Sequence, residues 1–197
     1  MKLEDKLIRT FLSVPVPIQV GSKKNMLYST LDEKFKVNWV KNNNLHLTIK
    51  FLDFTKESAI PELLIEINKI TSTMEPFNLN IEKTGCFPNK EKAKILWLGV
   101  TGIINPLIDL FNKFEIMLKG YGFPLEEMDY NPHITIARIK YPQKITPDVS
   151  LFLNSTFDPI QFPIDRVQFL SSELVSTGVV YTLIKSFPLG ESLTKEK

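Results

Sequence analysis

The chain contains two histidines, and both stand in the same short setting. The first segment is His46-Leu47-Thr48-Ile49, and the second is His133-Ile134-Thr135-Ile136. Side chains two residues apart in a strand point to the same face, so each segment would place an imidazole beside a hydroxyl on one surface. Two such surfaces facing each other would surround a small anion with an acid, a base and two hydroxyl donors. That arrangement suits phosphodiester chemistry.

In-line cleavage of a phosphodiester needs a base on the attacking oxygen and an acid on the leaving oxygen, on opposite sides of phosphorus. His46 and His133 suit these roles, because an ordinary histidine pKa near 6.5 allows one neutral and one protonated ring near neutral pH. Thr48 and Thr135 could donate to the non-bridging oxygens, which gain charge in the transition state. A 2′,3′-cyclic phosphate is a suitable substrate, because its ring strain permits hydrolysis without a metal.

Two basic residues follow the histidines on the same strands. If alternation is strict, Lys50 shares the face of His46 and could contact phosphate, although strand lysines often cover an edge instead. Arg138 would fall on the face of Ile134 and Ile136, where a guanidinium is costly. Either the strand bulges or ends before Arg138, or this residue pairs elsewhere. Both residues are candidate substrate contacts.

Metal binding is the main alternative use of two histidines. Zinc sites usually take three or four protein ligands at recognisable spacing, and the sequence has no such cluster of His, Cys, Asp or Glu. The one cysteine, Cys86, stands alone and fits a small core residue. A P-loop, a dinucleotide-binding fingerprint and a serine nucleophile elbow are also absent from the sequence. We therefore expect no metal and no cofactor.

The composition bounds the class of protein. The chain has 197 residues, of which 43% are apolar and 23% charged, as in ordinary globular domains. The net charge of +2 is too small for general nucleic-acid coating, so any RNA binding needs a specific site. A single cysteine favours a reducing compartment, and Pro15 and Pro17 break the one apolar stretch near the N-terminus. We expect a cytoplasmic protein with no membrane contact and no obligatory protein partner.

Hydrophobic periodicity predicts a mixture of strands and helices. Helical spacing marks 60–70, and 105–120 carries an apolar stripe with Asn105 as the expected cap, Pro106 in the first turn and Gly120 as the stop. Less well-marked helices are expected at 22–35 and 148–153. Strand patterns fall at 7–14, 45–52, 77–82, 93–100, 133–139, 161–170 and 179–186.

The two histidine segments lie nearly half the chain apart, and each half supplies strands and at least one amphipathic helix. This suggests two similar lobes whose motif strands face each other across a cleft. No linker rich in Pro, Gly or Ser separates them. We therefore predict one two-lobed domain over 1–187, followed by a mobile tail at 188–197.

Taken together, these segments resemble the two-histidine (2H) phosphoesterase superfamily, in the branch of RNA 2′,3′-cyclic phosphodiesterases that are also named 2′-5′ RNA ligases. The resemblance spans roughly Arg9 to Lys185. Besides the two histidine segments, it is carried by 9–15, 39–40, 50–52, 85–88, 95–100, 131–132, 137–138 and residues Gly178, Val180 and Tyr181.

The resemblance implies an α+β fold with two antiparallel sheets lining a central cleft, helices outside and a pseudo-two-fold axis. It also implies His46 as general acid, His133 as general base, Thr48 and Thr135 as phosphate ligands, and a 2′-phosphate product made without metal or nucleotide cofactor. Two departures stand outside this catalytic set: Lys94 where the family often has Arg, and Asp53 where it often has Gly.

The substrates expected are RNA ends or small cyclic-phosphate nucleotides, with reverse 2′-5′ ligation as an additional activity. Two alternatives stay open at the level of the sequence. One is a 2H relative acting on 2′-5′ oligoadenylate or on a cyclic phosphate of ADP-ribose. The other is an RNA-end binding protein with a slow site, which the intact pair of motifs disfavours because binding alone needs no acid and base.

Overall fold

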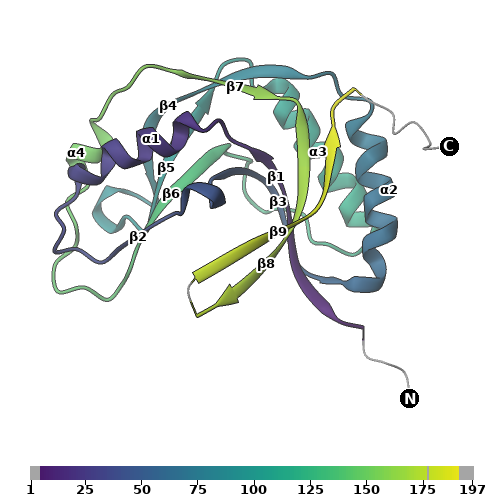
Figure 1. Cartoon of the computed structure of the whole chain (residues 1–197), viewed down its shortest axis with the longest axis horizontal. Coiled ribbons are helices and arrows are strands. Elements are labelled where there is room, and N and C mark those ends of the chain that lie inside the picture. The colour runs from purple at the N-terminus through teal and green to yellow at the C-terminus, as the bar shows by residue number, and fades with distance from the viewer. Residues whose placement is uncertain (1–4, 177, 191–197) are drawn as a thin grey trace.

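The computed structural model describes residues 5–176 and 178–190, and two antiparallel sheets form its framework (Figure 1). The four-stranded sheet has the order β3-β1-β8-β9. Its strands are β1 (Leu7–Pro15), β3 (His46–Lys56), β8 (Arg166–Val175) and β9 (Gly178–Pro188). The five-stranded sheet has the order β2-β6-β5-β4-β7. Its strands are β2 (Val37–Trp39), β4 (Phe77–Phe87), β5 (Ile95–Thr101), β6 (His133–Ile139) and β7 (Ile160–Ile164).

Helices cover the outer sides of the sheets. They are α1 (Gln19–Met26), α2 (Ile60–Thr71), α3 (Asn105–Gly120) and α4 (Ser150–Leu153), with 3-10 turns at Leu27–Thr30, Asn42–Asn44, Glu57–Ala59 and Lys90–Lys92. Helices α2 and α3 pack together against the four-stranded sheet, whereas α4 packs on β4 of the other sheet. Figure 1 shows these two groups of helices at opposite ends of the molecule. The predicted α+β two-lobed fold is confirmed.

The apolar stripe of α3 is buried as its spacing predicts, and its members are Leu107, Leu110, Phe111, Phe114 and Leu118. The predicted cap is wrong: Ile104 takes the N-cap position and makes no side-chain bond, while Asn105 is already helical. Pro106 stands in the first turn, where its missing N–H costs nothing. Burial of the stripe therefore outweighs the absent cap in fixing this helix.

Several other predicted boundaries differ from the structure, and the strands expected at 45–52 and 77–82 extend to Lys56 and Phe87. The helix expected at 22–35 is α1 followed by a 3-10 turn that ends at Thr30, and short β2 was not predicted. The strand expected at 161–170 is two strands, β7 and β8, separated at Asp165. Strand β9 continues to Pro188 and Leu189 is buried, so the ordered chain extends into the predicted tail. The rest of that tail, 191–197, lies outside the described residues.

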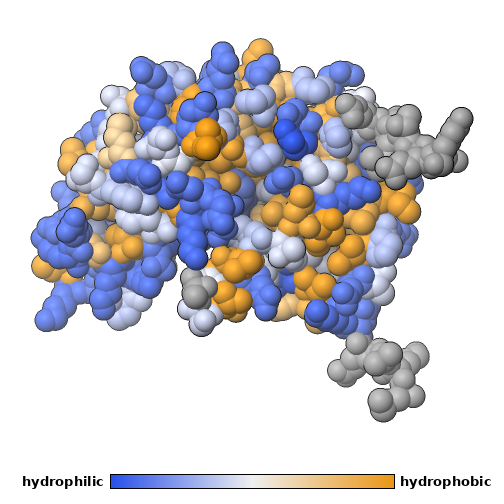
Figure 2. Space-filling view, viewed as in Figure 1, coloured by the Kyte–Doolittle hydropathy of each residue, from blue (hydrophilic) through white to orange (hydrophobic). Residues whose placement is uncertain are grey.

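Strands β8 and β9 form a long hairpin that projects from the body of the molecule. Apolar residues are exposed near its free end, where Leu174 is 79% and Val180 43% exposed, as the orange surface at that end in Figure 2 shows. The hairpin joins the sheet through β8, which pairs with β1. It therefore carries Tyr181 to the side of His46. No helix within the described residues is long and apolar enough to cross a bilayer.

Candidate active site

His46 and His133 begin their strands and are held in the same way. The Nδ1 atom of His46 lies 2.8 Å from the carbonyl oxygen of Asn44, and that of His133 lies 2.7 Å from the carbonyl oxygen of Asn131. A carbonyl oxygen only accepts, so each Nδ1 carries the proton and donates it. Each Nε2 then points away from its anchor, and neither has a hydrogen-bond partner within the described residues. Both imidazoles are thus fixed in the tautomer that leaves Nε2 available for proton transfer.

Each imidazole also packs against two aromatic rings. Phe11 and Tyr181 lie 4.9 Å and 5.3 Å from the ring of His46, centroid to centroid. Phe87 and Trp97 lie 5.0 Å and 6.1 Å from the ring of His133. The aromatic rings restrict rotation of the imidazoles and bury one side of each. Strands β3 and β6 contact each other, which brings the two histidines to a common cleft.

Burial is the largest cause that lowers the pKa of His46, and it also lowers the pKa of His133. The carbonyl bonds act in the opposite direction, because they stabilise the protonated rings. The positive charge of Arg138 lowers the pKa of both rings, and His133 adds to the effect on His46. These mutual effects require that Arg138 and the two imidazoles lie close together. A bound anion would counter the positive charge and favour one protonated ring.

Thr48 and Thr135 are half-buried two residues beyond the histidines, on the same face, while Leu47 and Ile134 between them are fully buried. The strand faces predicted around each motif therefore agree with the structure. Within the described residues neither threonine hydroxyl has a hydrogen-bond partner. Both hydroxyls are free to donate to a bound anion.

An extra residue interrupts the regular pairing of each motif strand. In β3 the first such residue is Ile49, with a second at Leu52, and in β6 it is Ile136. A bulge of this kind shifts the side chains that follow to the opposite face of the strand. Lys50 is consequently turned into the core, whereas Arg138 returns to the cleft and is exposed. The structure thus realises one of the two alternatives left open for Arg138.

The prediction of Lys50 as a phosphate contact is wrong. Its side chain is 3% exposed, and its Nζ lies 2.7 Å from Oε1 of Glu115 and 3.3 Å from Oε1 of Glu126. The same ammonium donates to the carbonyl oxygen of Pro124 at 2.8 Å. The ammonium of Lys50 therefore forms an ion pair that joins β3 to α3. Strict alternation misplaced it because the bulge at Ile49 cannot be read from the residue types.

Sequence reasoning missed the carbonyl anchors and most of the aromatic walls. A signal for the anchors is present, since Asn44 and Asn131 each stand two residues before a histidine. The aromatic contacts had no local signal, because they come from strands distant in the chain. No three His, Cys, Asp or Glu side chains of the described residues are grouped as a metal site would need.

The sequence pattern of one family fits this chain twice. It matches residues 14–97 and again residues 98–181, and each match contains one histidine motif. The family is described as LigT like Phosphoesterase. This chain belongs to the LigT-like phosphoesterase family. The double match also supports the similarity of the two halves that the spacing of the motifs suggested.

Individual relatives agree with this membership. A protein named RNA 2′,3′-cyclic phosphodiesterase from Thermotoga maritima is 30% identical over 182 residues, covering 90% of this chain and 93% of the relative. A protein of the same name from Aquifex aeolicus is 28% identical and covers 94% of this chain and 99% of the relative. The resemblance to the 2H phosphoesterase superfamily and its RNA 2′,3′-cyclic phosphodiesterases, which was predicted from the sequence, is confirmed, and with it the assignment as a phosphoesterase.

Solved structures share the fold of this LigT-like chain. The structure of TT0787 from Thermus thermophilus has a TM-score of 0.78 at 23% identity, covering 93% of this chain and 98% of that one. Escherichia coli LigT complexed with 3′-AMP has a TM-score of 0.76 at 19% identity, covering 94% and 100%. The two-sheet architecture therefore persists where most residues differ.

Proposed function

We propose that the protein hydrolyses 2′,3′-cyclic phosphates at RNA ends to 2′-phosphomonoesters without a metal, with His46 as general acid and His133 as general base. The observation that carries the proposal is the matched anchoring of the two imidazoles. Each donates from Nδ1 to a backbone carbonyl oxygen and leaves Nε2 free. An acid and a base that act on one phosphorus atom need this fixed tautomer.

The proposed reaction uses the two free Nε2 atoms. Nε2 of His133 takes a proton from water as the water oxygen forms a bond to phosphorus. The bond from phosphorus to O3′ breaks, and Nε2 of His46 gives its proton to O3′. The products are a 2′-phosphomonoester and a free 3′-hydroxyl. Strain in the five-membered ring favours opening, so no metal is needed to assist the leaving group.

Charge on the non-bridging oxygens is met by three donors. The hydroxyls of Thr48 and Thr135 and the guanidinium of Arg138 supply them from both motif strands. Donors that are in place before the charge develops need no reorganisation during the reaction. Arg138 alone among the three carries a positive charge, so it also attracts the anionic substrate.

RNA is the proposed substrate because the relatives named above are RNA 2′,3′-cyclic phosphodiesterases and cover nearly the whole chain. The modest net charge of +2 agrees with recognition of an RNA end rather than of a long duplex. Small cyclic nucleotides would then be accepted as truncated substrates. Formation of a 2′-5′ linkage would use His133 and His46 in the same roles, with a 5′-hydroxyl attacking phosphorus in place of water. Cleavage of that linkage, the reverse step, would exchange the two roles.

The test uses a dinucleotide ending in a 2′,3′-cyclic phosphate, with and without EDTA, and identifies the product by phosphorus NMR. We expect a 2′-phosphate at the same rate in EDTA. Replacement of His46 or His133 by Ala should lower turnover by about 10²–10⁴-fold, as loss of one general acid or base does. Near-normal turnover in either variant, a 3′-phosphate product, or activity lost in EDTA and restored by zinc would each refute the proposal.

Two further substrates separate the alternatives. Cleavage of 2′-5′ oligoadenylate or of an ADP-ribose cyclic phosphate in strong preference to the dinucleotide would place this protein with a different substrate class. Tight binding of the dinucleotide without turnover would indicate an RNA-end binding protein instead. Circular dichroism of the two histidine variants serves as the control for folding.

A further inference from the structure

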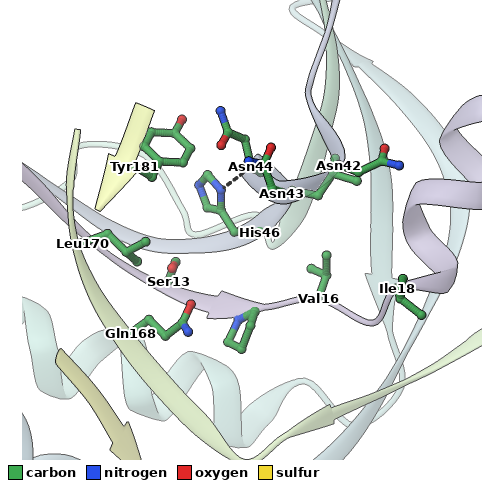
Figure 3. Close-up of a pocket in the computed structure, with 12 residues that line it drawn as sticks. Ser13, Val16, Ile18, Asn42, Asn43, Asn44, His46, Gln168, Leu170 and Tyr181 are labelled. Carbon is green, nitrogen blue, oxygen red and sulfur yellow. Dashed lines mark hydrogen bonds between the residues drawn. The ribbon is translucent and has the colours of Figure 1, made fainter. Parts of the chain in front are cut away.

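A pocket of about 300 Å³ opens beside His46, and His133 is not among the residues that line it (Figure 3). Strands β1 and β8 form its floor, the 3-10 turn Asn42–Asn44 forms one wall, and Tyr181 of β9 forms another. Its volume is suited to a group the size of a nucleobase. The pocket lies on one side of the cleft only.

Two polar side chains on the floor have no hydrogen-bond partner among the residues that the structure describes. Ser13 and Gln168 lie opposite each other in the pairing of β1 with β8, and Figure 3 shows them side by side below His46. Ser13 is completely buried, yet its Oγ makes no hydrogen bond to any described residue. The amide of Gln168 likewise has no hydrogen-bond partner in 5–176 or 178–190. A buried hydroxyl left unpaired is costly, so its presence on a pocket floor points to a ligand that pairs with it.

The wall of the pocket is held in place independently of any ligand. The side-chain amide of Asn44 donates to the carbonyl oxygen of Val179 at 2.9 Å, and its backbone oxygen accepts from His46. One residue therefore ties together the turn, β9 and the imidazole. The pocket is a pre-formed site that shares a wall with the candidate acid.

The other lobe shows what fills the equivalent position. Ser13 is paired with Thr48 in the first lobe, and Trp97 is paired with Thr135 in the second. On the other side of each, Ser13 is paired with Gln168 and Trp97 with Gly85. The indole of Trp97 lies across Gly85 so closely that an added Cβ would come within 2.2 Å of two ring atoms. In the second lobe the indole of Trp97, which lies over Gly85, thus fills the space that stays open in the first lobe. The difference between the lobes therefore follows from the residue types at these equivalent positions.

We propose that this pocket binds the nucleobase of the nucleotide that carries the cyclic phosphate, with Gln168 and Ser13 hydrogen-bonding to the base edge. The inference rests on the proposed function, which places the ribose against His46 because its O3′ receives the proton. Water enters from the side of His133 and needs no such pocket. An amide offers a donor and an acceptor in one plane, which matches the edge of a base.

The ring of Tyr181 supports the same ligand. It is half-buried, belongs to the wall of the pocket and packs edge-on against His46. Unpaired RNA bases are commonly recognised by an aromatic surface together with hydrogen bonds to their edges. The pocket combines these two elements directly beside the candidate acid.

The experiment compares nucleoside 2′,3′-cyclic phosphates of all four bases with methyl riboside 2′,3′-cyclic phosphate, which has the same ring and no base. Ser13→Ala and Gln168→Leu should each raise KM for the preferred nucleotides about tenfold, the effect of one hydrogen bond of about 1.4 kcal/mol. The same variants should leave the methyl riboside unaffected and reduce the differences among the four bases. Gln161→Leu, on the exposed face of β7, is the matched control.

A stability measurement separates binding from a structural role. Because the Ser13 hydroxyl is unpaired, Ser13→Ala should not lower the melting temperature. A lower melting temperature together with equal losses on nucleotides and methyl riboside would overturn the pocket assignment. So would a wild-type enzyme that hydrolyses the methyl riboside with the same KM as every nucleotide. If the wild-type enzyme hydrolyses none of these cyclic phosphates, the proposed function fails and the pocket assignment fails with it.

Discussion

Phe51 and Arg138 occupy equivalent positions in the two lobes, each two residues beyond the bulge in its motif strand. Both side chains return to the exposed face because the bulge reverses the alternation. One lobe therefore presents an aromatic ring where the other presents a guanidinium. The two halves share a backbone plan but provide the cleft with a single cation at this pair of positions.

Replacing Arg138 by Gln should lower kcat/KM for a 2′,3′-cyclic nucleotide by about 10²-fold, because a charged donor to the phosphate oxygens is lost. Steady-state kinetics at low and high salt would show a smaller salt dependence in the variant, since steering of the anion is weakened. The matched variant Phe51→Leu should change kcat/KM little. Equal effects of the two substitutions would contradict the asymmetry.

The threonine hydroxyls are tested by Thr48→Val and Thr135→Val, which keep the shape of the side chain. Each should reduce kcat/KM by at most about 10²-fold without lowering the melting temperature, because one donor to the phosphate is removed. Leu47→Thr and Ile134→Thr form the reverse control: both positions are fully buried, and a buried hydroxyl needs a partner. Both variants should have a lower melting temperature than the wild-type protein. The opposite pattern in the four variants would mean that the strand faces are inverted.

The pH dependence of kcat/KM should be a bell whose optimum lies below 6.5. Burial and the charge of Arg138 lower the pKa of both histidines in the free enzyme. His133 is consequently neutral, and able to act as a base, already at pH values below the ordinary histidine pKa. His46 likewise loses the proton that it must donate at a pH below that value. In Arg138→Gln one cause of the lowering is removed, so the remaining activity should peak at higher pH. An optimum above 7 that Arg138→Gln leaves in place would disagree with this arrangement.

The buried Lys50–Glu115 ion pair should matter for stability and not for chemistry. Lys50→Met leaves the buried carboxylate of Glu115 without its cation and should lower the free energy of unfolding by about 3–5 kcal/mol. Lys50→Met combined with Glu115→Leu should recover much of that loss, measured by urea denaturation. The exposed pair Lys69–Glu66 is the control, and Lys69→Met should cost about 0.5 kcal/mol or less.

Activity provides the second readout for Lys50. Because its ammonium lies among Glu115, Glu126 and the Pro124 carbonyl, the folded Lys50→Met protein should retain its KM. A large rise in KM with unchanged stability would restore Lys50 to the substrate site.

Local pattern was sufficient to predict the motif strands and the main helices. Strand β6 begins at His133 and ends at Ile139 as predicted, and α3 spans Asn105–Gly120. In α3 the periodicity of the buried residues is uninterrupted, with Pro106 near its start and Gly120 at its end. In β6 buried and half-buried residues alternate from His133 to Ile136, which was enough to predict the strand. The two lobes could also be predicted, because the motifs repeat at a separation of nearly half the chain.

Features that depend on pairing between distant segments could not be predicted in the same way. A bulge arises from the way in which two strands pair. The faces on which Lys50 and Arg138 lie therefore depend on the pairing of the motif strands with β1 and β5, which the local sequence does not specify. The same holds for the pocket: Ser13 and Gln168 become neighbours only through the pairing of β1 with β8. Their residue types carry no local signal of that contact.

Each sheet combines strands from both matched halves of the chain. Strands β8 and β9 complete the sheet that begins with β1 and β3, and they bring Gln168 and Tyr181 to the side of His46. During synthesis on a ribosome, His46 and His133 therefore emerge before the strands that build the wall beside His46. Until β9 is made, the nascent chain has no complete pocket and no Tyr181 ring against the imidazole. Translation of this hairpin is thus the step that completes the pocket beside His46.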